Sequence, residues 1–222
     1  MTDTSNRSSS PVNARAQSER ALLCDLFEVV GPDAPTLCEG WATRDLAAHL
    51  IVREGRLDTS FGIFIPPLRG WTDHVIGKTA KKDWATLIGK VRNGPPRTSM
   101  MRIASVDGAA NTLEFAIHHE DVRRAVPDWT PRDIDTDFAD DIWARLAKFG
   151  QLFRNVNVGV TLARPNGATH VVKKAPEGHG SVTLTGEPLE LALRSYGRMQ
   201  SQVTVSGDDA DVAEFEKSRV GF

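Results

Sequence analysis

Three ionisable residues with the chemistry of metal ligands or of an ion-paired cluster, Glu114, His118 and Asp121, are spaced for one face of a single helix. At about 100° per residue, Glu114 and His118 lie one above the other, and Asp121 falls on the same side. This stripe also carries the helix's small apolar residues, which predict burial. Because unpaired charges are costly to bury, the stripe needs a partner, either a basic residue or a metal ion.

A second helical segment adds His49 and Glu54. His49 falls at the edge of an apolar face, a position that also suits an ordinary histidine at the margin of a core. Glu54 falls near the middle of that face, where an ion pair with an arginine would neutralise it. Arg53, Arg56 and Arg102 are the partners that we consider for it.

Other reactive residue types give weaker patterns. His119 points about 100° away from its neighbour His118, so we expect it at the surface. Cys38 precedes a Gly-Trp turn and is either a reactive thiol or a small buried apolar residue; the second interpretation is the commoner one. The chain contains no G-x-S-x-G elbow, no P-loop and no G-x-G-x-x-G motif, which argues against the enzyme classes built on them.

The first part of the chain has helical periodicity. Thr43 is a plausible N-cap for the segment that carries His49, and the apolar run from Asp58 to Gly70, broken by Pro66 and Pro67, predicts a packed loop. An acidic cluster between Asp133 and Asp141 precedes another helical pattern and suits a helix start. The helices that we expect before this cluster cover residues 11–30, 44–57, 83–91 and 108–126.

The hydrophobic period changes near Val156, where apolar residues begin to alternate as in a half-buried strand. Asn166-Gly167 then predicts a hairpin turn. Further strands around residues 169–173, 182–184 and 203–205 and helices at 188–196 and after Gly207 complete a small mixed sheet. We therefore expect an α+β protein with a disordered segment at residues 1–10, a helical domain at 11–155 and a small α/β domain at 156–222.

The composition excludes several classes of protein. The 222 residues include 27 Lys and Arg against 29 Asp and Glu, a net charge of −2 that argues against binding nucleic acid through bulk positive charge. Two cysteines cannot form a disulfide framework. No apolar run is long enough for a membrane span, and the polar first ten residues lack the apolar stretch of a signal peptide. We expect a soluble cytoplasmic protein.

Two segments resemble a known family. C-E-G-W-A-T-R-D-L-A-A-H-L, ending at Leu50, and L-E-F-A-I-H-H-E-D-V-R-R-A, ending at Ala125, are similar to motifs of the mycothiol-dependent maleylpyruvate isomerase family, within the DinB-like metalloprotein superfamily. The resemblance implies an N-terminal four-helix bundle that holds a divalent metal. Mapped onto this chain, the implied ligands are His49, Glu114 and His118.

The resemblance extends to the end of the chain. G-E-P-L-E-L-A-L-R-S-Y-G-R and the following V-T-V-S-G-D look like the family's smaller α/β domain, which is similar to sterol-carrier folds. In the isomerase, an arginine of that domain takes part in the chemistry, and Arg198 is the position that matches it here. The resemblance is specific for the fold and the metal and much less specific for the reaction.

Two imidazoles and one carboxylate leave at least one open position on a metal, as in catalytic sites. Zn²⁺ suits these ligands best, although Ni²⁺ would also bind. An open Zn²⁺ can activate water or capture a thiol as thiolate, and in this family the thiol is mycothiol. We therefore expect a metal-dependent mycothiol transferase or isomerase. Asp121 and Arg198 are its candidate catalytic residues, Asp121 as an acceptor that supports His118 or as a proton carrier, and Arg198 as the group that binds an anion. The alternatives are a non-catalytic metal-binding or sensing module and a metal-dependent hydrolase.

The apolar run from Phe61 to Leu68 is a candidate lining of the cleft, and it has no recognisable specificity motif.

Overall fold

The computed structural model describes residues 11–55, 69–95 and 108–221. The segment expected to be disordered (1–10), most of the apolar run at 58–70 and the end of the helix expected to reach Leu57 lie outside these ranges. The chain divides into two compact units, Met1–Trp129 and Thr130–Phe222. The fold is α+β, because the described part of the first unit is helical and the second contains a four-stranded sheet.

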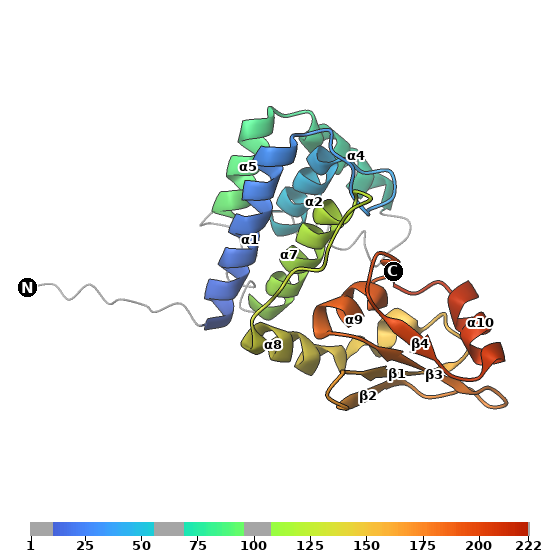
Figure 1. Ribbon diagram of the computed structural model, residues 1–222. Helices are drawn as coiled ribbons and strands as arrows, with labels where there is room; N and C mark the ends of the chain where they lie inside the picture. The colour runs from blue at the N-terminus through green and yellow to red at the C-terminus, as the bar shows by residue number, and fades with distance from the viewer. Residues whose placement is uncertain (1–10, 56–68, 96–107, 222) are drawn as a thin grey trace, which may run out of the picture. The chain divides into compact units, whose positions relative to one another are not determined.

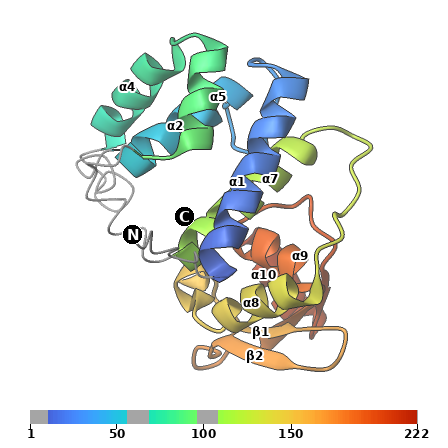
Figure 2. The same ribbon diagram turned by 90° about the vertical axis from the view of Figure 1, so that its left-hand side faces the viewer.

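Helices make up the described part of the first unit, and Figures 1 and 2 show them lying against one another. Apolar residues from α1, α2, α5 and α7 form its main core. The helices are α1 (Pro11–Val30), α2 (Thr43–Gly55), α4 (Arg69–Ala80), α5 (Trp84–Asn93) and α7 (Gly108–Arg123).

The core holds α2 and α7, the two helices with the predicted metal ligands, in a fixed arrangement. Leu46 and Leu50 of α2 and Phe115 of α7 are fully buried in the same cluster. Replacing one buried side chain of this size by alanine typically costs about 2–5 kcal/mol of stability. The backbones beneath the site are therefore anchored by ordinary apolar packing.

The start of α2 differs from the expected cap. Thr43 is the first residue of the helix, and its hydroxyl donates to the carbonyl of Gly31. The side chain of Asp45 instead accepts from the backbone N–H of Ala42, 3.0 Å away. Thr43 was wrong as the N-cap because its hydroxyl is used to tie α2 to the end of α1.

The sheet of the second unit has the strand order β2-β1-β3-β4. β1 (Gly159–Ala163) pairs antiparallel with β2 (Thr169–Lys173) and parallel with β3 (Ser181–Thr185), and β4 (Thr204–Ser206) runs antiparallel to β3. The predicted hairpin joins β1 to β2, with Gly167 at a φ of 88° that favours glycine. The parallel pairing of β1 with β3 requires the chain to cross over after the hairpin.

Helices α8 (Thr136–Leu146), α9 (Pro188–Ser195) and α10 (Asp209–Lys217) and the 3₁₀-helix η3 (Phe149–Phe153) accompany this sheet. The predicted domain boundary lies near residue 155, whereas the packing divides the chain after Trp129. The difference arises because α8 packs against α9 and η3 against β2.

The acidic cluster begins α8 as expected, since the Asp135 side chain accepts from the N–H of Phe138 at 2.8 Å. Among the helices of residues 11–55, 69–95 and 108–221, none is both long and apolar enough to cross a membrane.

Candidate metal centre

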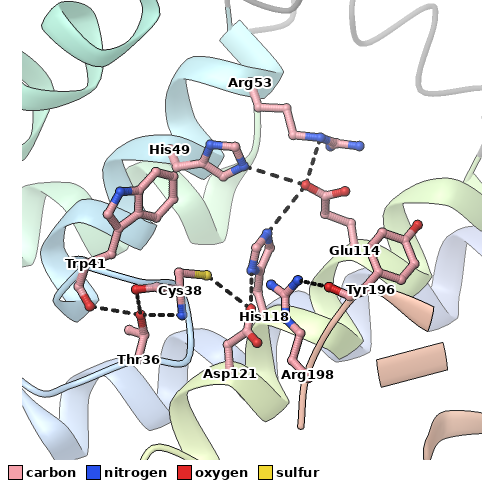
Figure 3. Close-up of polar contacts among 10 residues, drawn as sticks. All are labelled: Thr36, Cys38, Trp41, His49, Arg53, Glu114, His118, Asp121, Tyr196 and Arg198. Atoms are coloured by element: carbon pink, nitrogen blue, oxygen red, sulfur yellow. Dashed lines mark hydrogen bonds and ion pairs between the residues drawn. The ribbon is translucent and has the colours of Figure 1, made fainter. Parts of the chain in front are cut away.

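The predicted ligands come from two neighbouring helices and converge (Figure 3). His49 extends from α2, while Glu114 and His118 lie one turn apart on α7. The Glu114 carboxylate oxygen Oε1 is 3.7 Å from Nε2 of His49 and 3.5 Å from Nε2 of His118. The three donor atoms all lie within 4.8 Å of one another.

These separations fit one shared ion. Ligand atoms bound at about 2.0–2.1 Å to a tetrahedral zinc ion are about 3.3 Å apart. The donor set also fits, because imidazole nitrogen and carboxylate oxygen are common ligands of zinc and similar metals. The three side chains are partly buried, with 11–23% of their surface exposed.

Asp121 supports His118 from the other side of the imidazole ring. Nδ1 of His118 lies 2.9 Å from Oδ2 of Asp121, whose side chain is fully buried. Histidines that bind metals through one ring nitrogen usually donate the other N–H to such an acceptor, which fixes the tautomer and the orientation of the ring. The Asp121 carboxylate therefore lies where an acceptor for the His118 N–H would lie, and its role stays a prediction.

Arg53 also belongs to the site, although the sequence analysis considered it only as a partner of Glu54. Its Nε lies 2.9 Å from Oε1 of Glu114, and its Nη1 donates to Oδ1 of Asn111 at 3.1 Å. The signal that could have found it is its position four residues after His49 on α2, which places both side chains over the same face.

His118 lies between the carboxylates of Glu114 and Asp121, and these contacts shift the pKa values of His118 and Glu114. Burial alone would lower the pKa of His118, but hydrogen bonds to Asp121, Cys38 and Glu114 raise it well above the ordinary range. Burial alone would raise the pKa of Glu114, but His118, His49 and Arg53 hold it well below its usual value.

Desolvation lowers the pKa of His49, which favours its neutral form. Without a metal, the two carboxylates beside His118 therefore favour its imidazolium form. A metal ion would take the place of that positive charge.

Most of the chain has a counterpart in fold among solved structures. No family model matches the sequence, and no curated protein matches it. Among solved structures, mycothiol-dependent maleylpyruvate isomerase matches with a TM-score of 0.62 over 93% of this chain and 96% of the isomerase chain. A variant of that enzyme with one histidine replaced by alanine matches with a TM-score of 0.63 over the same shares.

This chain has the fold of mycothiol-dependent maleylpyruvate isomerase. The sequence identity to the isomerase is 16% in both comparisons, so the likeness concerns the fold. It agrees with the family that the two sequence segments resemble.

Glu54 forms the expected ion pair with an arginine, but with none of the three arginines considered, and the expected exposure of His119 was wrong. Glu54 pairs with Arg20 of α1, whose Nη1 donates to Oε2 of Glu54 at 2.6 Å while Nη2 contacts Oε1. His119 is buried, only 7% exposed, and its Nδ1 lies 4.0 Å from Oε2 of Glu19. Both differences have one cause: α1 packs along α7 and supplies partners that a single helix cannot reveal.

Cys38 is partly buried, in line with the commoner interpretation, and its reactivity stays a prediction. Its side chain packs against the apolar core of the helical unit. Its Sγ also donates to Oδ2 of Asp121 at 3.2 Å, so the thiol is part of the polar cluster.

Arg198 belongs to the second unit of the isomerase fold. It follows α9, and its Nη1 donates to the carbonyl oxygen of Tyr196 at 2.8 Å. Its part in the chemistry stays a prediction.

Proposed function

We propose that this protein is a divalent-metal-dependent transferase or isomerase that uses a low-molecular-weight thiol, mycothiol, to act on a small electrophile. The observation that carries the proposal is the convergence of His49, Glu114 and His118 from α2 and α7. The fold shared with a mycothiol-dependent isomerase supports the same conclusion.

We infer Zn²⁺ as the metal, with Ni²⁺ as the next best fit, because two imidazoles and one carboxylate suit both ions. Three protein ligands leave a coordination position open, as catalytic zinc sites require. When bound, the ion supplies a positive charge that favours the deprotonated form of an incoming thiol.

The surrounding side chains have separate tasks in this proposal. Asp121 holds His118 in one tautomer, and Arg53 orients Glu114 by contacting the same oxygen that faces the histidines. We assign Arg198 the recognition of a carboxylate on the thiol or on the electrophile, because a guanidinium can bind a carboxylate through two parallel hydrogen bonds.

The finer assignment of the architecture is part of the same proposal. We infer that the helical unit is a DinB-like four-helix bundle and that the sheet unit is a sterol-carrier-like domain. The helices of the first unit and the four-stranded sheet with α9 and α10 of the second are compatible with both assignments.

The test is a titration of cobalt-substituted protein with mycothiol. The Cys38→Ser variant is the starting protein, because the Cys38 thiol lies beside His118 and could contribute its own sulfur signal. We expect mycothiol to produce a sulfur-to-cobalt charge-transfer band, and an analogue with the sulfur replaced by oxygen to produce none.

Activity toward a panel of small electrophiles completes the test. Thiol transfer or isomerisation should require the metal and should fall when Arg198 is replaced by lysine, which keeps the charge but loses the planar fork. If no band appears and metal-loaded protein is no faster than stripped protein, the thiol proposal fails. A metal-binding module without turnover would then be the better account.

A further inference from the structure

A second group of possible metal ligands lies on the opposite side of His118. Sγ of Cys38, Nδ1 of His118 and one carboxylate oxygen of Asp121 all lie within 4.8 Å of one another. The sulfur is 3.2 Å and the nitrogen 2.9 Å from the same Asp121 oxygen, Oδ2. Figure 3 shows the three side chains meeting on the side of the ring that faces away from Glu114.

The backbone that carries Cys38 is held in place. The Thr36 hydroxyl accepts from the N–H of Cys38 and donates to the carbonyl of Trp41 at 2.8 Å. The N–H of Leu37 donates to the carbonyl of Asp121 at 2.9 Å, which ties this segment directly to α7. The thiol therefore faces Asp121 because of a preformed backbone arrangement.

The donor types of this group differ from those at the His49 side. It offers a thiolate sulfur in addition to an imidazole nitrogen and a carboxylate oxygen, and thiolates select soft ions. Asp121 supplies a fully buried negative charge that an incoming cation would compensate. The partial exposure of Cys38 gives such an ion a route to the group.

We propose that Cys38, His118 and Asp121 form a second metal site, selective for thiophilic divalent ions such as Cd²⁺. It competes for His118 with the His49–Glu114–His118 group. The inference depends on the geometry of this cluster and not on the proposed thiol chemistry.

Competition follows from the structure of the imidazole ring. A neutral imidazole has one nitrogen with a free lone pair, while the other nitrogen carries a proton. His118 can therefore bind through Nε2 toward Glu114 or through Nδ1 toward Asp121, but not through both in its neutral form. An ion bound to Cys38 and to Nδ1 of His118 would displace the thiol proton and the Nδ1 proton of the imidazolium, and both would go to solvent. The remaining ring proton would stay on Nε2, which would withdraw His118 from the first group.

The experiment titrates the full-length, metal-free protein, without a histidine tag, with cadmium chloride. Two signals are measured: ultraviolet sulfur-to-cadmium charge-transfer absorption, and the alkylation rate of each cysteine by mass spectrometry. We expect one Cd²⁺ per chain, a charge-transfer band, and protection of Cys38 from alkylation. Cys38→Ser should abolish the band and weaken Cd²⁺ binding by about tenfold or more.

Cys24 provides the matched control, because it is the second cysteine and is fully buried in the apolar core. Burial raises the pKa of its thiol to about 11, so it should react slowly with or without cadmium. Cys24→Ser should keep the band. Asp121→Asn is a second test of the ligand group, because it has nearly the same shape and should weaken the cadmium signal without removing the thiol.

His49→Ala separates this site from the proposed function. It should reduce Ni²⁺ and Zn²⁺ binding but keep the cadmium band, while His118→Ala should lose both. The proposal is overturned if wild-type protein gives no cadmium–sulfur band, if Cys38→Ser keeps it, or if His49→Ala abolishes it. The thiol proposal can fail while these results hold, and the reverse also applies.

Discussion

At the scale of single residues, His118 is the centre of the cluster. One ring nitrogen faces Glu114 and the other faces Asp121, at 3.5 and 2.9 Å. Both carboxylates favour the imidazolium in the metal-free protein, and both remain useful when a metal replaces the proton, one as a ligand and the other as an acceptor for N–H.

This arrangement predicts how the stability of metal-free protein depends on pH. The pKa of His118 is raised above 6.5, so its contribution is complete below pH 6.5 and is lost as the pH rises through the raised value. The pKa of Glu114 is depressed, so its contribution is present above its ordinary value of 4.5 and is lost as the pH falls through the depressed one. Urea unfolding at a series of pH values measures both effects.

His118→Gln is the control for the alkaline side of that profile. Because glutamine does not titrate, the decline in the free energy of unfolding above pH 6.5 should be smaller in the variant than in wild type. Equal alkaline slopes in the two proteins would show that His118 is not protonated between the carboxylates.

Asp121 gives a second prediction at this scale. Asp121→Asn keeps the size of the side chain but weakens its acceptor strength toward His118, so affinity for zinc should fall by about 10–100-fold. Competition with a chromogenic chelator measures the change. Asp73→Asn, at an exposed position of α4, should leave zinc affinity unchanged. An unchanged affinity in Asp121→Asn would remove Asp121 from the account of the site.

Among the helices of the first unit, α1 contributes a partly buried arginine, Arg20, that contacts α2 and α7, the two helices with the predicted metal ligands. The Arg20 guanidinium bonds Glu54, donates to the carbonyl of Val91 at 2.8 Å and lies over the Phe115 ring at 4.1 Å. It thereby links α1 to α2, α5 and α7 beneath the centre.

Breaking the ion pair between Arg20 and Glu54 should lower the free energy of unfolding substantially. Glu54→Gln leaves the Arg20 charge buried without its partner, and such losses typically cost about 3–5 kcal/mol in the free energy of unfolding. Asp33→Asn is the matched control, because Asp33 is 82% exposed in its pair with Arg44, and surface pairs contribute about 0–1 kcal/mol. A loss in Glu54→Gln as small as that of the control would contradict a structural role for the pair.

In these helices, hydrophobic periodicity predicts which residues share a face but not which residues of other helices they contact. The spacing of Glu114, His118 and Asp121 gives their shared face correctly, since that face depends only on the helix. The partner of Glu54 and the burial of His119 depend on α1, which is far away in the sequence. Helix α4 was not predicted, although Val75, Ile76 and Ala80 of this helix are buried. Their short stripe follows a proline-broken run and did not stand out as a helix.

At the scale of the whole molecule, the likeness to the isomerase covers both units, since it extends over 93% of the chain. Sequence reasoning identified the two kinds of architecture but placed their boundary at the change of hydrophobic period. The change of hydrophobic period marks the start of strand β1, but it does not predict which unit α8 packs against. The contacts of α8 with α9 are tertiary, which is why the compact unit begins near residue 130.

If His49, Glu114 and His118 together bind a divalent ion, the purified protein should contain that ion. Elemental analysis of protein purified without a histidine tag, and of metal-free protein reloaded with zinc or nickel, should give about one ion per chain. Glu114→Ala should lose most of that metal, whereas His74→Ala, at an exposed histidine of α4, should keep it. A stable protein that contains no metal and takes up neither zinc nor nickel would contradict the account.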